Sequence, residues 1–159
     1  MPKSLTYPDA LVKAQRYCAY QDRCHQEIRF KLVQWGVYGE DLENILADLI
    51  AEGFLDEERF ARSFARGKFR MKQWGRLRIA GELKKRGISD YCLRAGLSEI
   101  EEEDYLQTLR DLLSKKKEQL DPAYTPFERM QLLIRQGIGK GYETDLVQRL
   151  AAELGSSES

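Results

Sequence analysis

The sequence has few of the residues that define disulfide-rich, metal-binding or membrane proteins. Its 159 residues include three cysteines and one histidine. Three cysteines are an odd number without the spacing of a disulfide framework, and the four residues do not form the two close pairs that a structural zinc site usually has. No apolar run approaches the roughly 18 residues that a membrane-spanning helix needs, and the first residues lead into no apolar signal segment. We therefore expect a cytoplasmic protein with free thiols, no membrane partner, no cofactor and no bound metal.

Residues that favour β-strands are also scarce. The chain has four Val, eight Ile and four Thr against 21 Leu, and good helix formers are abundant. All four prolines lie near the start or in one short connector, which leaves residues 9–121 without the strongest helix breaker. The composition predicts an all-α protein.

One short pattern occurs three times at a nearly constant period. In Leu32–Val37, Leu83–Ile88 and Leu133–Ile138, a Leu stands four residues before a Gly, and a β-branched apolar residue follows that Gly. The spacing is 51 and then 50 residues between Gly36, Gly87 and Gly137. Each copy is typical of an amphipathic helix that ends at a left-handed glycine, with the next residue folding back onto the last turn.

We predict three tandem three-helix repeats over 8–53, 54–98 and 99–154, followed by a disordered tail over 155–159. The expected helices are 8–22, 25–35, 40–52, 57–73, 76–86, 90–97, 100–119, 125–136 and 142–154. Gly53 should end the third helix, Asp56 and Ser89 should cap later ones, and Thr125-Pro126 should start another. Because stacked repeats contact only their neighbours, we expect an elongated, curved helical array with a right-handed or similar twist.

Charge is strongly segregated along the chain although the net charge is zero. Residues 40–58 hold eight acidic residues and no Lys or Arg. Residues 59–94 hold twelve Lys or Arg against two acidic residues. A second acidic cluster at 99–104 follows, and then the Lys115–Lys117 run. The middle of the chain is its electrostatically distinctive part.

Four arginines of the helix expected at 57–73 recur at steps of three, four and four residues, within an arc of about 80°. A solvated face, with Arg59 pairing to Asp56, is one interpretation. The neighbouring cations favour a surface that binds an anion, either a phosphate backbone or an acidic protein. The predicted partner-binding residues are Arg59, Arg62, Arg66, Lys68, Arg70, Lys72, Arg76, Arg78, Lys84, Lys85 and Arg86.

Catalysis has no support in the sequence. Asp56, Glu57 and Glu58 open a predicted helix, where carboxylates complement the helix dipole, and this reading is preferred over paired-carboxylate chemistry. Cys24 and His25 lack a second pair of metal ligands, and no phosphate-binding glycine loop is present. We therefore expect a binding protein and not an enzyme.

Two tryptophans each adjoin a glycine at a predicted helix boundary. For both Trp35 and Trp74, packing between modules is the preferred interpretation, and base stacking is the alternative. The sequence alone leaves both roles open.

The residues of the middle repeat resemble the signature of the bacterial regulatory RecX family. The resemblance is strongest in Gly53–Ala61, which reads Gly-Phe-Leu-Asp-Glu-Glu-Arg-Phe-Ala. It continues through Gly75, Arg78-Ile79, Glu82-Leu83 and Arg86-Gly87-Ile88. It covers about residues 10–154, more loosely in the first repeat, where Cys24-His25 stands in place of the usual Arg-Ser.

This resemblance implies a cytoplasmic modulator of the recombinase RecA. Members of the family bind along the groove of the RecA filament on single-stranded DNA and limit strand exchange, ATP turnover and repressor cleavage. The expected partner is therefore the RecA filament, with single- or double-stranded DNA as a further candidate, and the protein is expected to be a monomer. A tandem helical DNA-binding protein that acts independently of RecA is the alternative.

Overall fold

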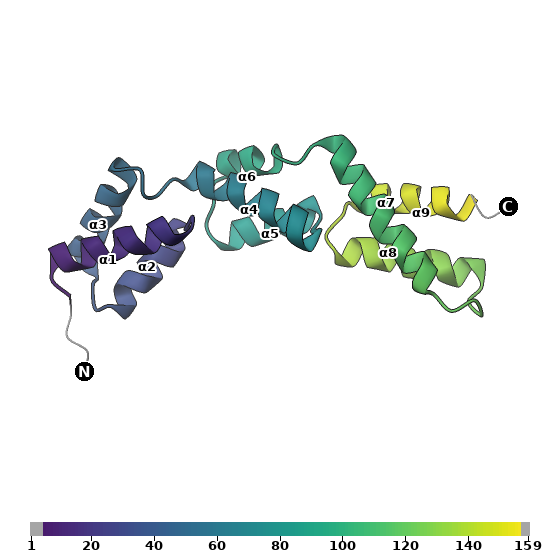
Figure 1. The fold of residues 1–159 in the computed structure, drawn as a ribbon, viewed down its shortest axis with the longest axis horizontal. Coiled ribbons are helices and arrows are strands. Elements are labelled where there is room, and N and C mark those ends of the chain that lie inside the picture. The colour runs from purple at the N-terminus through teal and green to yellow at the C-terminus, as the bar shows by residue number, and fades with distance from the viewer. Residues whose placement is uncertain (1–4, 157–159) are drawn as a thin grey trace. The chain divides into compact units, whose positions relative to one another are not determined.

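Helices joined by short loops form all of the regular secondary structure in residues 5–156, the part of the chain that the computed structural model describes (Figure 1). The nine helices of this region follow one another as three triplets, which confirms the all-α prediction. The first triplet is α1 (Tyr7–Tyr20), α2 (His25–Gln34) and α3 (Gly39–Ala51). The second is α4 (Glu57–Lys72), α5 (Arg76–Lys85) and α6 (Asp90–Leu97). The third is α7 (Glu102–Gln119), α8 (Pro126–Gly139) and α9 (Thr144–Ser156).

The chain packs as two compact units, between which the middle triplet is divided. The first unit contains the residues through Ser63 together with Leu83–Gly96. The second unit contains Phe64–Glu82 together with the residues from Leu97 onward. The elongated, curved array stays a prediction.

The first triplet has an apolar core because its helices carry apolar residues at helical spacing. Ala10, Ala14 and Cys18 recur every four residues on α1, and Ile28 and Leu32 do so on α2. These residues pack with the apolar face of α3, formed by Leu42, Ile45, Leu46 and Leu49. Trp35 lies half-buried against this same core, so its packing is within the first triplet.

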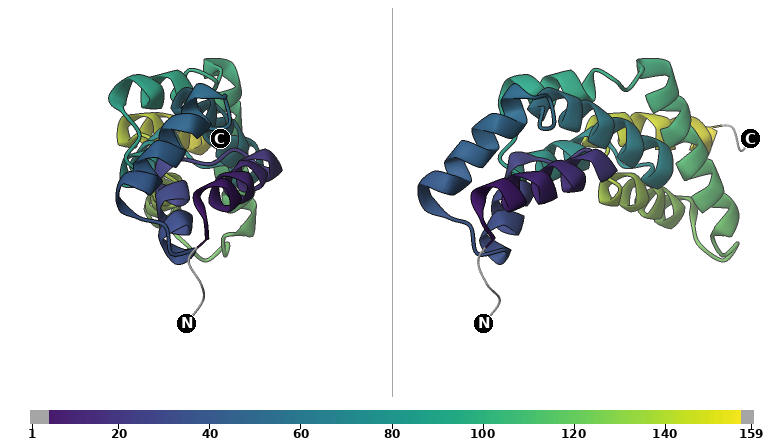
Figure 2. Two further views of the ribbon diagram at one scale, coloured as in Figure 1. Left: turned by 90° about the vertical axis from the view of Figure 1, so that its left-hand side faces the viewer. Right: turned by 60° about the vertical axis from the view of Figure 1, so that its left-hand side comes forward.

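In the second unit, α8 and α9 pack against each other and α7 contacts both, as Figures 1 and 2 show. The buried residues of α7 include Tyr105, Leu109 and Leu113. Val147 and Leu150 are buried on α9. This core therefore contains a tyrosine, whose hydroxyl group needs a polar partner.

The predicted helix starts are confirmed by their hydrogen bonds. The Asp56 carboxylate accepts from the Arg59 backbone N–H at 2.9 Å, and the Ser89 hydroxyl accepts from that of Cys92 at 3.3 Å. The Thr125 hydroxyl accepts from the Glu128 N–H at 3.1 Å, while the Glu128 carboxylate accepts from the Thr125 N–H at 3.0 Å. These side chains satisfy N–H groups that the helices cannot pair internally.

Two of the three predicted glycine helix ends are confirmed. Gly36 has φ 83° and Gly87 has φ 74°. After Gly36, the Val37 N–H donates to the carbonyl of Leu32 at 2.8 Å. Ile88 donates in the same way to Leu83 at 3.2 Å. This six-to-one bond closes the turn in both helices.

The third predicted glycine end is wrong by four residues. Helix α8 continues through Gly137 to Gly139, and Gly141 is the left-handed residue, with φ 98°. The Tyr142 N–H then donates to the carbonyl of Gly137 at 3.1 Å. A Cβ atom at position 137 would lie 2.6 Å from Cγ1 of Val147 on α9. Gly137 therefore serves close helix packing, which a short sequence pattern cannot distinguish from a helix end.

The end of the chain also differs from its prediction. Helix α9 runs to Ser156, so Gly155 is helical and does not begin a disordered tail. Residues 157–159 of that predicted tail lie outside the described residues. The other helix boundaries differ from the predictions by a few residues at most.

Candidate anion-binding surface

The eleven predicted partner-binding residues are divided between the two units. Arg59, Arg62 and Lys84–Arg86 belong to the first unit, and the other six belong to the second. Helix α4 is continuous, so Arg59, Arg62, Arg66 and Arg70 follow one side of it, as predicted. Lys84 and Lys85 are exposed in the last turn of α5, where cations complement the helix dipole.

Arg59 has a structural role in the first unit. Its Nε donates to the Asp22 carboxylate at 2.9 Å. The same guanidinium donates to the carbonyls of Gly53 and Phe54 at 3.1 and 3.2 Å. Asp22, and not Asp56, is therefore its acidic partner, and Asp56 caps α4 instead. These bonds tie the start of α4 to the connector between α1 and α2.

Two further arginines of α4 lie beside carboxylates. Nε of Arg62 lies 3.5 Å from Oε2 of Glu58, one turn earlier on the same helix. Nη1 of Arg66 lies 2.8 Å from Oε1 of Glu99 within the second unit. Exposed pairs of this kind contribute little to stability. They lower the positive charge that this part of α4 presents to a partner.

Arg76 belongs to a polar cluster in the second unit. Its guanidinium pairs with Glu143 at 2.9 Å and with Glu102. The guanidinium carbon lies 3.8 Å from the centre of the Tyr105 ring. The buried Tyr105 hydroxyl accepts from the Arg76 backbone N–H at 2.9 Å and donates to Glu143. Arg76 therefore helps to connect the start of α5 to α7.

A second buried tyrosine extends this cluster. The Tyr142 ring stacks on Tyr105 with 4.9 Å between ring centres. Its hydroxyl donates to the carbonyl of Gln73 at 2.9 Å. Burial raises the pKa of both tyrosines above the ordinary value of 10.0. This cluster could not be predicted from the sequence, because its bonded partners are 26 to 69 residues apart.

Four predicted cations of the second unit differ from Arg66 and Arg76, since they form no ion pair with the residues described in that unit. Among the described residues of this unit, no carboxylate forms an ion pair with Lys68, Arg70, Lys72 or Arg78. Nζ of Lys68 lies 5.0 Å from the centre of the Trp74 ring, and Cζ of Arg78 lies 4.3 Å from it. Trp74 also contacts Phe64 edge-on, at 6.4 Å between ring centres. Lys68 and Lys72 are one turn apart on α4, whereas Arg70 lies on the opposite side of this helix. There Arg70 lines a hollow with Asp104 and Asp111. We name Lys68, Lys72, Trp74 and Arg78 the aromatic-basic surface.

The cysteines form no reactive centre. Cys18, Cys24 and Cys92 are free and buried, and burial raises the pKa of Cys18 to about 11. Thiols of this kind are poor nucleophiles at neutral pH. In the described part of the chain, no three His, Cys, Asp or Glu side chains are close enough to hold a metal ion. No helix described there is both long and apolar enough to cross a membrane.

Relatives with curated descriptions cover different shares of the chain. The regulatory protein RecX of Shigella dysenteriae is 29% identical over an alignment of 152 residues that covers 89% of this chain and 89% of the relative. That of Geobacillus kaustophilus is 24% identical over 157 residues, covering 96% of this chain and 58% of the relative. That of Lactobacillus johnsonii is 29% identical over 98 residues, covering 62% of this chain and 36% of the relative. The chain thus spans about a third to three fifths of the length of the last two relatives.

Family models and a solved structure agree with these relatives. The crystal structure of RecX from Lactobacillus salivarius superposes with a TM-score of 0.84 at 20% identity, covering 93% of this chain and 96% of that one, and it supports the fold. Residues 56–97 match the model described as RecX, second three-helix domain. Residues 102–150 match the third three-helix domain. The two matched segments together exceed half of the sequence, and the chain belongs to the RecX family.

Proposed function

We propose that this protein binds the RecA filament on single-stranded DNA and inhibits its recombinase, ATPase and co-protease activities. The relatives are named regulatory proteins, and the RecA filament is the partner that the sequence resemblance implies. In this proposal the protein acts in the cytoplasm as a monomeric binding protein and has no catalytic role.

The observation that carries the proposal is the aromatic-basic surface. Among the described residues of the second unit its cations have no carboxylate partner, so a partner's anionic groups can pair with them without first breaking an ion pair. Attraction of this kind accelerates association and favours a partner of opposite charge. Arg59 and Arg76, by contrast, already hold carboxylates within the protein.

The test is RecA ATPase activity on single-stranded DNA, titrated with this protein. We expect the wild-type protein to suppress ATP turnover. The triple variant Lys68→Glu, Lys72→Glu, Arg78→Glu should need at least a tenfold higher concentration for the same suppression, because attraction becomes repulsion. Suppression by the wild type should also weaken between low and moderate salt.

A matched control changes the same charge elsewhere. Arg94, Arg135 and Arg149 are exposed cations outside the aromatic-basic surface, and their triple reversal to Glu should leave suppression nearly unchanged. If the two triple variants behave alike, the aromatic-basic surface is not the contact site. If the wild-type protein does not change RecA ATPase activity, the proposed function is wrong.

The alternative is a tandem helical DNA-binding protein that needs no RecA. The same observation favours it, because Lys and Arg beside the half-buried Trp74 ring also suit phosphates and stacked bases. Fluorescence anisotropy with duplex and single-stranded DNA separates the two functions. Tight duplex binding together with unchanged RecA ATPase activity would establish the alternative.

A further inference from the structure

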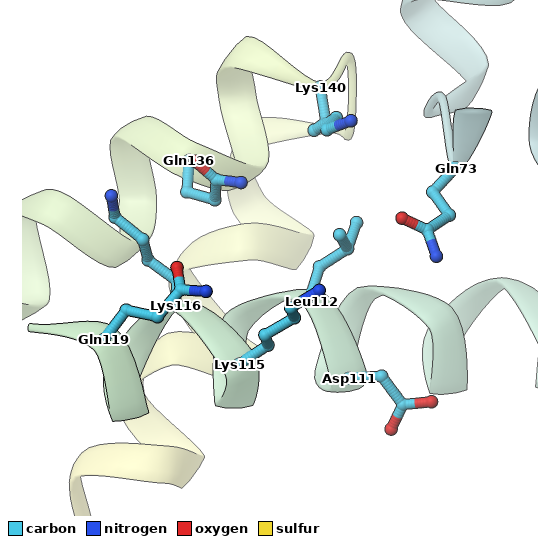
Figure 3. Close-up of a pocket in the computed structure, with 8 residues that line it drawn as sticks. All are labelled: Gln73, Asp111, Leu112, Lys115, Lys116, Gln119, Gln136 and Lys140. Atoms are coloured by element: carbon cyan, nitrogen blue, oxygen red, sulfur yellow. The ribbon is translucent and has the colours of Figure 1, made fainter.

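A hollow of about 310 Å³ lies in the second unit, lined by residues that follow or belong to α4, α7 and α8. Its volume is at the lower end of the range for small-molecule sites. Figure 3 shows polar side chains from three segments around one space, with Leu112 between them. These polar residues are Gln73, Lys115, Lys116, Gln119, Gln136 and Lys140.

Helical spacing brings these side chains together. Lys115 and Gln119 are four residues apart on α7, so they lie on neighbouring turns of one face. Gln136 and Lys140 have the same spacing at the end of α8. Gln73 directly follows α4. The site therefore depends on the packing of three segments and not on a continuous motif.

The hollow is positively charged. Its only acidic lining residue is Asp111, whose carboxylate accepts from the Gln107 amide at 2.8 Å. Figure 3 shows this carboxylate pointing away from the lysines. Among the described residues of the unit, no carboxylate forms an ion pair with Lys115 or Lys116. The next lysine of the run differs, because Lys117 Nζ donates to the Leu154 carbonyl at 2.9 Å.

Gln73 reaches the hollow from an unfavourable backbone conformation. With φ 59°, it is the one non-glycine residue in the described region with a positive φ, a conformation that residues with a Cβ atom rarely adopt. The hydrogen bond from Tyr142 to its carbonyl holds it in place. Glycine would fit this position without strain, but it has no side-chain amide to place at the rim of the hollow.

We propose that this hollow binds the terminal phosphate of a nucleotide, either free or at the 5′ end of a strand. The lysines supply charge, and the glutamine amides supply N–H donors. A phosphate monoester presents three acceptor oxygens and close to two negative charges. It satisfies more of these donors than one carboxylate of an acidic peptide does. This inference does not rest on the proposed action on RecA.

The test is an NMR titration of the full ¹⁵N-labelled chain with thymidine 5′-phosphate and, separately, with thymidine. We expect the nucleotide to shift the side-chain amides of Gln119 and Gln136, and the nucleoside to leave them unchanged. The double variant Lys115→Gln, Lys116→Gln should weaken nucleotide binding at least tenfold. Gln119→Ala, at an exposed position, is a second variant and should weaken it several-fold.

The matched control is Arg135→Gln with Arg149→Gln, which removes the same charge from exposed positions of the same unit. Its affinity for the nucleotide should stay within twofold of wild type. Competition by oligothymidine that carries a 5′-phosphate, but not by the unphosphorylated strand, would identify a strand end as the ligand. Competition by neither strand would identify a free nucleotide.

Three results would overturn the proposal. These are equal shifts with thymidine and its phosphate, equal losses in the pocket and control variants, and binding of an octaglutamate peptide at this site in preference to the nucleotide. The assay is independent of RecA, so its failure leaves the proposed regulatory function standing. A failed RecA assay likewise leaves this site untouched.

Discussion

The two units end helices α2 and α8 with the same backbone turn but fill it differently. In the first unit the residue after the left-handed glycine is Val37, an apolar side chain 5% exposed. In the second unit it is Tyr142, which is fully buried, stacks on Tyr105 and donates to the Gln73 carbonyl. One turn inserts an apolar side chain into a core, and the other links three segments through polar bonds.

The backbone around the second turn is also more tightly held. The Gly75 N–H donates to the Lys140 carbonyl at 2.8 Å, and the Leu77 N–H donates to the Gly141 carbonyl at 3.0 Å. A Cβ atom at Gly141 would lie 2.3 Å from Cβ of Arg78, whereas one at Gly87 would meet nothing within 4 Å. A side chain at Gly141 would therefore collide with its neighbour, whereas one at Gly87 would meet open space.

The largest expected effect is that of Gly141→Ala. It combines backbone strain at positive φ with a direct clash against Arg78, so we expect a loss of about 3 kcal/mol or more in the free energy of unfolding. Gly87→Ala carries only the strain and should lose about 1 kcal/mol. Urea unfolding of both variants measures the difference, and equal losses would contradict the packing argument.

Tyr105→Phe should follow in size. The substitution leaves the Arg76 backbone N–H and the Glu143 carboxylate without their shared partner, at a cost of about 2 kcal/mol. Tyr91→Phe, at an exposed tyrosine, is the control and should be nearly neutral. Chemical denaturation measures both, and a neutral Tyr105→Phe would show that the polar cluster does not stabilise the second unit.

Stability should fall as the pH rises above 10. The folded state raises the pKa of Tyr105 and Tyr142, whereas in the unfolded chain tyrosine titrates near 10. Above that pH the unfolded state releases protons that the folded state keeps, so unfolding becomes more favourable. We expect each tyrosine to contribute a loss of about 1 kcal/mol between pH 10 and 11, so about 2 kcal/mol for the pair. In the Tyr105→Phe, Tyr142→Phe double variant, the free energy of unfolding should fall less steeply with pH. An equally steep fall would show that these two tyrosines do not cause it.

The smallest effect concerns a single tyrosine of the first unit. The Tyr7 hydroxyl donates to the Asp48 carboxylate at 2.5 Å, which raises the pKa of Tyr7 to about 12. Asp48→Asn removes the negative charge and should bring this pKa back toward 10. An NMR titration of the Tyr7 ring would follow the change. An unchanged pKa in the variant would show that Asp48 is not its cause.

The partner-binding role of the predicted residues stays a prediction, and the structure adds which carboxylates lie beside them. The spacing of Arg59, Arg62, Arg66 and Arg70 on one side of a helix follows from helical periodicity. Helical periodicity does not predict which of these arginines have acidic partners. Asp22 and Glu99 are 37 and 33 residues from the arginines that they bind. The roles of Lys115–Lys117 likewise depend on the packing of α7, α8 and α9. Lys115 and Lys116 line the hollow, whereas Lys117 donates to a carbonyl near the end of α9.

The sequence by itself determined the helical class, the three triplets and most helix ends. These features rest on interactions within a few residues, such as the Asp56 and Ser89 caps and the turns at Gly36 and Gly87. Only the tertiary structure decided that Gly137 allows close helix packing and that Gly141 forms the turn. The reason is that the role of Gly137 depends on its contact with Val147 on α9. It also decided the tyrosine cluster and the lysine-glutamine hollow, because their side chains meet only when distant helices pack.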